Sequence, residues 1–455
     1  MPIHEQALEW AKRPLAFMES SRRCYGDIFT LRVRPGRPWV FLADPRDVGK
    51  VLTIAPHLVR AGAGEANPLL GPLLGPRSVM LLDEPDHMTH RKFMLPAFHG
   101  ERMQGYGQIM VEVASREIAA WPIGEPFALW PRMQAITNDV VMRAVFGSTS
   151  SEQIGRIRTS LSRLTDWLND PSRLTLLSTF GSRWLTRDTG FHQVIQPVEA
   201  ALLEEVRRRR SAAPRPEDDG ILSLLERAYD DHGSPMTDQE LRDELITLLS
   251  DGPTATSLAW VFDRLVRHPD SYRRLREEVL AGKHESYVDA VVKETLRLCP
   301  AVPIVMRELV EPIELGGFQL PAGTIVAPAI YLVHHREDIY PRPFSFEPER
   351  FLEQPGASPA INNYTWLPFG SGVRRCVAAQ FAQVEMKRVI QTVVREVDLT
   401  AASSTSEEPA RSSVSFAPGA GAVVIATPRT NGRTNHAASP ILRSGSCTQG
   451  SASER

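Results

Sequence analysis

The chain has 455 residues, of which 42% are hydrophobic and 23% are charged, and its 52 Lys and Arg nearly balance 54 Asp and Glu. This composition is ordinary for a globular protein with a large core, and it excludes a largely disordered, collagen-like or coiled-coil chain. The small net charge supplies no overall field that would attract nucleic acid or an anionic membrane. Length alone would allow about three domains at ~150 residues each, although single catalytic domains of this size also occur.

The cysteines are too few and too widely spaced for a disulfide scaffold or for a zinc or redox site built on paired cysteines. They are Cys24, Cys299, Cys376 and Cys447. This usage favours a reducing, cytoplasmic setting. Charged residues interrupt the N-terminal segment, and nowhere does an apolar run approach the ~18 residues that a membrane span needs. We therefore expect a soluble protein without a membrane anchor.

The 36 prolines outnumber the 30 glycines, and they recur between periodic stretches, which predicts many helices joined by irregular connections. Near the N-terminus, residues 28–33 and 39–42 flank an Arg-Pro-Gly-Arg turn and are predicted to form a pair of strands. Residues 61–76 mix Gly, Pro and Leu and are expected to form a long loop with an apolar face. The final segment, residues 430–455, is rich in Ser, Gly, Asn and Arg and is predicted to be a disordered tail.

A long central helix is predicted to begin at Thr237, which with Glu240 forms a capping box ahead of an apolar stretch. This helix is expected to break at Gly252 and Pro253 and then to resume and run to about residue 268. Proline lacks a backbone N–H and clashes with the carbonyl of the residue four positions earlier, here Leu249, so a kink is predicted at this point.

The string Phe369-Gly-Ser-Gly-Val-Arg-Arg-Cys376 stands directly before the amphipathic pattern VAAQFAQVEMKRVIQTVV. It places a cysteine at the N-terminus of a predicted helix, where the helix dipole and the two adjacent arginines favour a thiolate. The two glycines would let backbone N–H groups approach a flat ligand, and a thiolate is a good soft metal ligand. A Gly-rich turn with a buried, inert cysteine fits this string equally well.

A second pattern places Glu294 and Arg297 three residues apart, on one face of a predicted helix. A surface ion pair is the simpler interpretation, but apolar residues surround these two positions. A buried pair would need further hydrogen-bond partners. Arg350, in the downstream string FEPERF, is the candidate third member.

These strings occur in the order Glu294-x-x-Arg297, Phe346-Glu-Pro-Glu-Arg350-Phe and Phe369-Gly-x-Gly-x-Arg-x-Cys376. In this order they resemble the cytochrome P450 family of haem-thiolate monooxygenases, and the resemblance covers about residues 10–428. It implies a mainly α fold with a smaller β-rich region, forming one domain over residues 1–429 around one haem b (iron protoporphyrin IX). It also implies an oxidoreductase that takes electrons from a ferredoxin and its reductase.

The resemblance assigns roles position by position. Cys376 is implied to be the iron ligand, with the ring of Phe369 packed beside it. The implied propionate-binding residues are His87, Arg91, Arg307 and Arg374, with histidine at 87 where many members have tryptophan. Glu294, Arg297 and Arg350 are implied to form a buried structural network. Ala378 replaces a more usual glycine, which is a small change.

The central helix departs from the family pattern. Members usually carry a small residue, Gly, any residue, an acid and Thr, whose acid and alcohol relay protons. Here the text is Ser250-Asp-Gly-Pro-Thr254-Ala-Thr256, which lacks the acid before threonine and is about two residues short. Asp251 and Thr254, three residues apart, are the candidates to restore the relay, with ordered water as an alternative.

Three functions follow as alternatives. The first is a monooxygenase that oxidises a largely apolar small molecule, a specialised metabolite, as a monomer in the cytoplasm. The second is a related enzyme that rearranges, couples or dehydrates its substrate, or uses peroxide. The third is a haem or ligand-binding protein without turnover. The sequence names neither the substrate nor the particular redox partner.

Overall fold

The computed structural model describes residues 1–33, 37–62, 70–100, 102–147, 152–170, 172–173, 176, 182–212, 219–250, 252–352, 361–412 and 415–429. The expected tail, residues 430–455, lies outside this range. The first helices are α1 (Ile3–Lys12), α2 (Pro14–Tyr25), α3 (Pro45–Thr53), α4 (Gly71–Leu74), α5 (Asp86–Met94), α6 (Arg102–Ile118), α7 (Leu129–Phe146) and α8 (Glu152–Leu168). They are followed by α10 (Ser182–Leu185), α11 (Thr189–Ser211), α12 (Ile221–Glu226), α13 (Asp238–Leu249), α14 (Gly252–Arg267), α15 (Pro269–Ala281), α16 (Ser286–Leu298), α17 (Ile330–His334) and α18 (Ala379–Glu396).

Short 3₁₀ helices and strands complete the fold. The 3₁₀ helices are η1 (Pro56–Leu58), η3 (Leu95–Phe98), η4 (Pro348–Phe351) and η5 (Gly372–Arg374). The strands are β1 (Ile28–Leu31), β2 (Trp39–Leu42), β3 (Val59–Arg60), β4 (Pro126–Ala128), β5 (Arg307–Leu309), β6 (Ile313–Leu315), β7 (Phe318–Leu320), β8 (Ile325–Pro328), β9 (Val397–Ala401), β10 (Pro409–Ser412), β11 (Ser415–Pro418) and β12 (Val423–Pro428). The expected fold class, mainly α with a smaller β-rich region, is confirmed.

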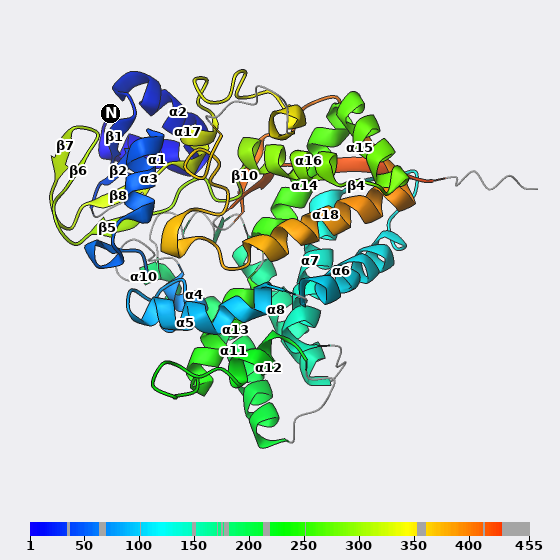
Figure 1. The fold of residues 1–455 in the computed structure, drawn as a ribbon, viewed down its shortest axis with the longest axis horizontal. Coiled ribbons are helices and arrows are strands. Elements are labelled where there is room, and N and C mark those ends of the chain that lie inside the picture. Colours follow the sequence, from blue (N-terminus) through cyan, green and yellow to red (C-terminus); the bar gives the residue numbers. More distant parts are fainter. Residues whose placement is uncertain are drawn as a thin grey trace, which may run out of the picture.

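The β-rich region lies at one side of the molecule, together with the N-terminal helices (Figure 1). Its main sheet has the order β1-β2-β8-β5-β3. Strands β1 and β2 pair antiparallel with Leu31 opposite Trp39, which confirms the predicted strand pair. Aromatic side chains of β1, β2 and α1 pack on one another, and Phe29 stacks on Phe41 with ring centroids 5.3 Å apart. This packing gives the region a core of its own.

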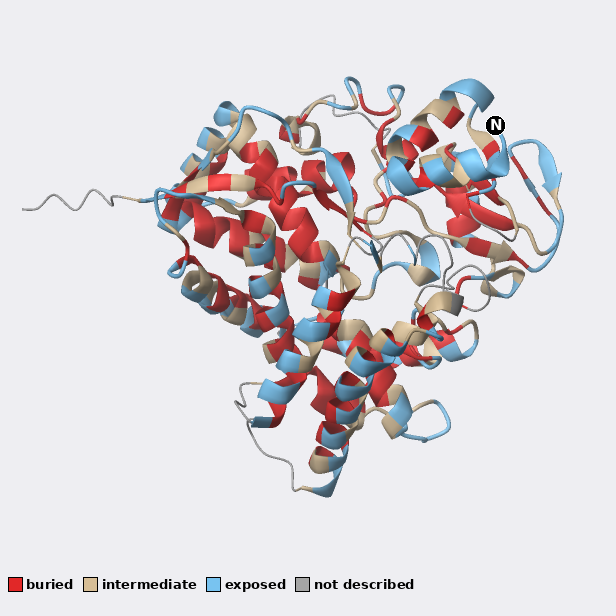
Figure 2. Cartoon of the chain, turned by 180° about the vertical axis from the view of Figure 1, so that it is seen from behind, coloured by how far each residue is buried: buried red, intermediate tan, exposed pale blue. Residues whose placement is uncertain are grey.

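The helical region is built around a larger core that runs from Leu74 to Ala426. Buried side chains are concentrated in its central helices, while exposed residues lie along the outer faces (Figure 2). Helix α14 lies deep in this core, because its residues from Thr254 to Asp263 are all buried. It packs against α7, α16, α18 and β11.

The central helix differs in detail from the sequence-based expectation. The capping box of Thr237 and Glu240 is present at the start of α13. That helix ends at Leu249, however, and a separate helix, α14, begins at Gly252. Pro253 therefore does not kink a continuous helix. It occupies the first turn of α14, where its missing N–H leaves no helix hydrogen bond unmade. The predicted break is therefore present, just before Gly252, and the predicted kink is corrected.

Candidate functional site

The segment from Phe369 to Cys376, here called the cysteine loop, lies between the β-rich region and the start of α18. Gly370 and Gly372 both have φ +69°, a left-handed conformation that favours glycine. A Cβ at Gly372 would lie 2.0 Å from the carbonyl oxygen of Leu52, so this position has no room for a side chain. The backbone N–H of Cys376 donates to the carbonyl of Phe369 at 2.9 Å. Cys376 itself is exposed, three residues before α18 begins.

The ring of Phe369 is held against the helical core. It is half-buried and packs edge-on against Trp366, with ring centroids 6.3 Å apart. Trp366 in turn donates its Nε1–H to the carbonyl of Lys293 on α16 at 3.1 Å. The loop before Cys376 is thus tied to α16 through an aromatic side chain.

The four basic residues that the resemblance assigned to propionate binding, here called the basic cluster, come from three elements. His87 and Arg91 lie on α5, Arg307 begins β5, and Arg374 ends η5. Arg374 Nη2 lies 3.1 Å from Asp83 Oδ1, and His87 Nδ1 lies 2.7 Å from Glu84 Oε1. Residues more than 280 positions apart in the chain are therefore brought to one place.

The pKa values of these groups report their proximity to one another. Burial, together with the positive charge of Arg374, lowers the pKa of Arg307 to about 10. The same two causes lower the pKa of His87. Burial also lowers the pKa of Arg91, and a negative charge on Cys376 opposes this shift. The basic groups thus repel one another in a partly dry space, next to the cysteine.

Glu294, Arg297 and Arg350 come together in a buried network. Arg297 donates from Nε and Nη2 to the two carboxylate oxygens of Glu294, at 2.7 and 2.8 Å, and neither side chain is exposed. Arg350 Nε lies 3.4 Å from Glu294 Oε1. Arg297 Nη1 also donates to the carbonyls of His334 and Pro343, at 2.9 and 2.7 Å. These contacts supply the further partners that a buried ion pair needs.

The structure describes only one of the two central-helix candidates. Thr254 lies in the first turn of α14 and is 5% exposed. Asp251 lies outside the described residues. Ser250, at the end of α13, donates from Oγ to the carbonyl of Ile246 at 2.7 Å.

Sequence reasoning did not identify the acids that accompany the basic cluster. Asp83 accepts hydrogen bonds from the backbone N–H groups of Ala61 and Gly62, at 2.8 and 2.9 Å, besides its contact with Arg374. It therefore ties residues 61 and 62 to the cysteine loop. The only signal was its place four residues before His87, and that spacing alone does not distinguish it from a solvent-exposed acid.

A buried histidine–carboxylate pair beside the cluster was missed for a different reason. His90 Nδ1 lies 2.8 Å from Glu244 Oε1, and the N–H of Val79 donates to the same oxygen at 2.8 Å. Burial raises the pKa of Glu244. Its partners are 154 and 165 positions away, so no local pattern could have indicated the pair.

No helix among the described residues is both long and apolar enough to cross a membrane.

Comparisons with known proteins agree on one family. The cytochrome P450 family model matches residues 2–423. Cytochrome P450 135B1 of Mycobacterium tuberculosis is 37% identical, covering 92% of this chain and 88% of that protein. Cytochrome P450 138 of the same species is 34% identical, covering 90% and 93%. This chain belongs to the cytochrome P450 family.

Solved structures show the same fold at lower sequence identity. The cyanobacterial CYP120A1 with bound retinoic acid aligns with a TM-score of 0.79 at 23% identity, over 93% of this chain and 96% of that one. The haem domain of cytochrome P450DA aligns with a TM-score of 0.81 at 21% identity, over 94% and 97%. The protein is accordingly a P450 monooxygenase, an oxidoreductase that uses haem, a redox partner and a substrate.

The residues at the cysteine loop fit a haem. Among the described residues, the three arginines and the histidine of this cluster face the two carboxylates of Asp83 and Glu84, so a ligand with two further carboxylates would relieve the repulsion. Haem carries two propionates. The exposed thiol of Cys376 beside Arg91 is a donor suited to iron.

Proposed function

We propose that this P450 binds haem b through Cys376 and oxidises a largely apolar small molecule, a specialised metabolite, with dioxygen and electrons from a ferredoxin system. The observation that carries the proposal is the position of Cys376 beside Arg91, within reach of the charges of the buried basic cluster. Haem bound through a thiolate supplies dioxygen activation, because the thiolate donates electron density that favours O–O cleavage.

The chain's own residues bind and orient the cofactor in this proposal. His87, Arg91, Arg307 and Arg374 hold the two propionates, and Phe369 packs beside the thiolate. The buried network of Glu294, Arg297 and Arg350 fixes the segment that precedes the cysteine loop. Protein groups of this kind supply binding, orientation and a dry pocket rather than the oxidation itself.

An apolar substrate is supported by the segments that family position places around the pocket. They are residues 61–80, 166–191, the central helix, 301–306 and the turn near Phe416, of which 61–80 and 301–306 carry few charged residues. Phe416 is buried, and its carbonyl accepts from Trp260 Nε1 at 2.8 Å, which ties this turn to α14. The retinoic acid bound by one structural relative is an example of a largely apolar ligand.

We propose a single domain over residues 1–429 and a monomeric, cytoplasmic protein. The larger core, whose residues run from Leu74 to Ala426, joins helices from both halves of the chain, which supports the single domain. Cys24, Cys299 and Cys376 are free thiols, which suits a reducing compartment.

The broken central helix favours a second candidate within the family, an enzyme that rearranges, couples or dehydrates its substrate or uses peroxide. The specific observation is the end of α13 at Leu249, which removes the continuous helix that carries the family's acid and threonine. Peroxide-driven or redox-free turnover would support this candidate over the monooxygenase.

Substitution of Thr254 tests how strongly the altered segment, residues 250–256, affects the coupling of NADPH consumption to product formation. We expect the wild type to form little product per NADPH consumed on generic apolar substrates, and T254A to lower this ratio further. Positioned proton donors typically contribute ~10²–10⁴-fold, so a displaced alcohol should leave turnover slow or uncoupled. The measurement is NADPH consumed against product formed. Tight coupling on simple substrates, unchanged in both T254A and D251N, would refute this expectation.

The ferredoxin is proposed to dock on the surface around the start of α18. Arg374, close to this surface in the chain, is only 13% exposed and pairs with Asp83, so it is an internal residue and not a docking cation. Lys387 is 22% exposed and lies 3.7 Å from Asp289. Arg375 is exposed. It is the principal candidate for contact with an acidic partner.

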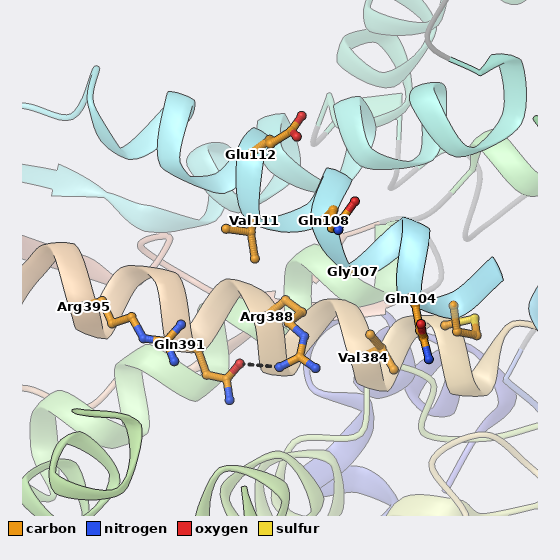
Figure 3. A pocket seen from close by; sticks show the side chains of 10 residues that line it. Gln104, Gly107, Gln108, Val111, Glu112, Val384, Arg388, Gln391 and Arg395 are labelled. Carbon is orange, nitrogen blue, oxygen red and sulfur yellow. Dashed lines mark hydrogen bonds between the residues drawn. The ribbon is translucent and has the colours of Figure 1, made fainter. Parts of the chain in front are cut away.

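An open groove of about 850 Å³ continues this surface between α6 and α18 (Figure 3). Arg388 and Arg395 of α18 line it opposite Gln104, Gly107 and Gln108 of α6. Arg388 is 36% exposed and donates to Gln391 at 2.8 Å and to Glu285 at 2.6 Å. Its charge is thus partly neutralised, and among the described residues of this face Arg375 and Arg395 remain as the exposed cations proposed for docking.

Reduction of the haem by an acidic ferredoxin is expected to slow as ionic strength rises, because salt screens the charges that guide docking. R375E should slow it several-fold at low salt. R23E, at a 71% exposed position on α2, is the matched control for charge reversal. Stopped-flow reduction at several salt concentrations measures both effects. A rate that is independent of salt, or an equal loss in R375E and R23E, would argue against this face.

A further inference from the structure

His334 connects the buried ion network to the cysteine loop. It ends α17, and its side chain is fully buried. On one side its carbonyl accepts from Arg297 Nη1 at 2.9 Å, while its ring Nδ1 lies 3.2 Å from the carbonyl of Arg297. On the other side the backbone N–H of Leu367 donates to its Nε2 at 2.7 Å. The imidazole thus lies between two backbones that are 70 residues apart.

These contacts fix the state of the ring. An acceptor at Nε2 requires a lone pair there, so Nδ1 carries the proton and donates to the Arg297 carbonyl. The ring is therefore neutral, with both nitrogens in use. Burial and the neighbouring charges of His335 and Arg297 lower the pKa of His334, which keeps it neutral in the same way.

Leu367 begins the chain of contacts that ends at the cysteine. The N–H of Gly370 donates to the carbonyl of Leu367 at 3.0 Å, and the N–H of Cys376 donates to that of Phe369 at 2.9 Å. Leu367 is itself fully buried. A shift of its backbone would therefore move the turn that sets the position of Cys376.

We propose that His334 is a positioning residue, which fixes the Leu367 end of the cysteine loop onto the Glu294–Arg297 network and so holds the Cys376 thiolate in place. It does not touch the cofactor, and it acts through Leu367. The proposal rests on Cys376 being the iron ligand. Without His334, the Leu367 N–H would be left buried and unpaired, which is a cost that backbone movement would relieve.

Two substitutions separate the two contacts. H334Q places an amide oxygen near the position of Nε2, so it can still accept from Leu367. H334N places its amide near Nδ1, so it can still donate to Arg297 but does not reach Leu367. The matched control is H335N, because His335 is also buried but directs its Nδ1 to the carbonyl of Tyr331 in its own helix, at 2.8 Å.

The readout is the carbon monoxide difference spectrum of the reduced holoprotein, which separates thiolate-bound haem from haem whose thiolate is protonated or displaced. H334N is expected to raise the ratio of displaced to thiolate-bound protein by roughly tenfold. H334Q and H335N should stay near the wild-type ratio. A wild-type ratio in H334N, or an equal rise in H335N, would overturn the proposal.

Amide hydrogen exchange on the wild-type holoprotein gives a second readout that needs no variant. The Leu367 amide should exchange as slowly as the buried amides of α16, and fast exchange would overturn the proposal even if H334N did not fold. If the wild type itself lacked the thiolate band, the assignment of Cys376 would fail. Slow exchange at Leu367 would still show that its N–H stays paired in the native fold, so the two failures are distinguishable.

Discussion

Replacing Cys376 with serine is expected to abolish the red-shifted Soret band of the reduced, carbonyl-bound protein and to reduce oxidation of any substrate to background. A serine hydroxyl is a hard, weakly coordinating ligand, so the electron donation that a thiolate provides would be lost. The fold should survive, because Cys376 is exposed and its backbone hydrogen bond to Phe369 does not depend on the side chain. Visible spectra and circular dichroism of C376S and wild type measure the two effects separately.

The remaining cysteines serve as controls for this prediction. C24S and C299S should both keep the band, although C299S is the one expected to lower stability, because this thiol is enclosed and burial raises its pKa to about 11. Cys447 lies outside the described residues and should also be replaceable. If the wild type lacked the thiolate band, or C376S retained it, the assignment of Cys376 would be wrong.

Breaking the Glu294–Arg297 pair is expected to be the most damaging change to stability. Removing one partner of a buried ion pair leaves the other charge buried and uncompensated, which costs about 3–5 kcal/mol. Here R297L would also leave three carbonyl groups, those of His334, Pro343 and Ser345, without their donor. We therefore expect R297L and E294L to accumulate poorly and to lose haem on mild heating.

A pair with the same spacing on the surface provides the control. Asp270 and Arg273 are also three residues apart, at 2.8 Å, but their side chains are 88% and 69% exposed. R273A should cost at most about 1 kcal/mol, as exposed ion pairs do. The comparison is the midpoint of urea unfolding and the haem retained. Equal effects of R297L and R273A would show that the buried network does not stabilise the fold.

The cysteine loop illustrates how much local sequence can determine. The glycines before Cys376 are required where the backbone turns left-handed and approaches Leu52, and the string that contains them was recognisable at once. The strand pair at residues 28–42 and the capping box at Thr237 were likewise predictable, since turn and cap residues act on neighbours within a few positions.

The break in the central helix shows the limit of such rules. Propensity correctly indicated that Gly252 and Pro253 disturb the helix, but it did not distinguish a kink from two separate helices. A kinked helix would keep the clash between Pro253 and the carbonyl of Leu249, whereas a new helix that begins at Gly252 places Pro253 in a first turn, where this clash does not arise. The choice depends on how α14 packs among α7, α16 and α18, which is a property of the whole core.

By itself the sequence indicated the family, the position of Cys376 after its glycine-rich loop, and the ion pair of Glu294 and Arg297. Each of these depends on residue type at short, fixed spacing. Only the tertiary structure decided that Asp83 joins Arg374, that His90 meets Glu244, and that His334 links Arg297 to Leu367. Each of these contacts joins segments that are 33 or more positions apart. Their partners are chosen by the packing of the helices around one core, and no local pattern of residues encodes that packing.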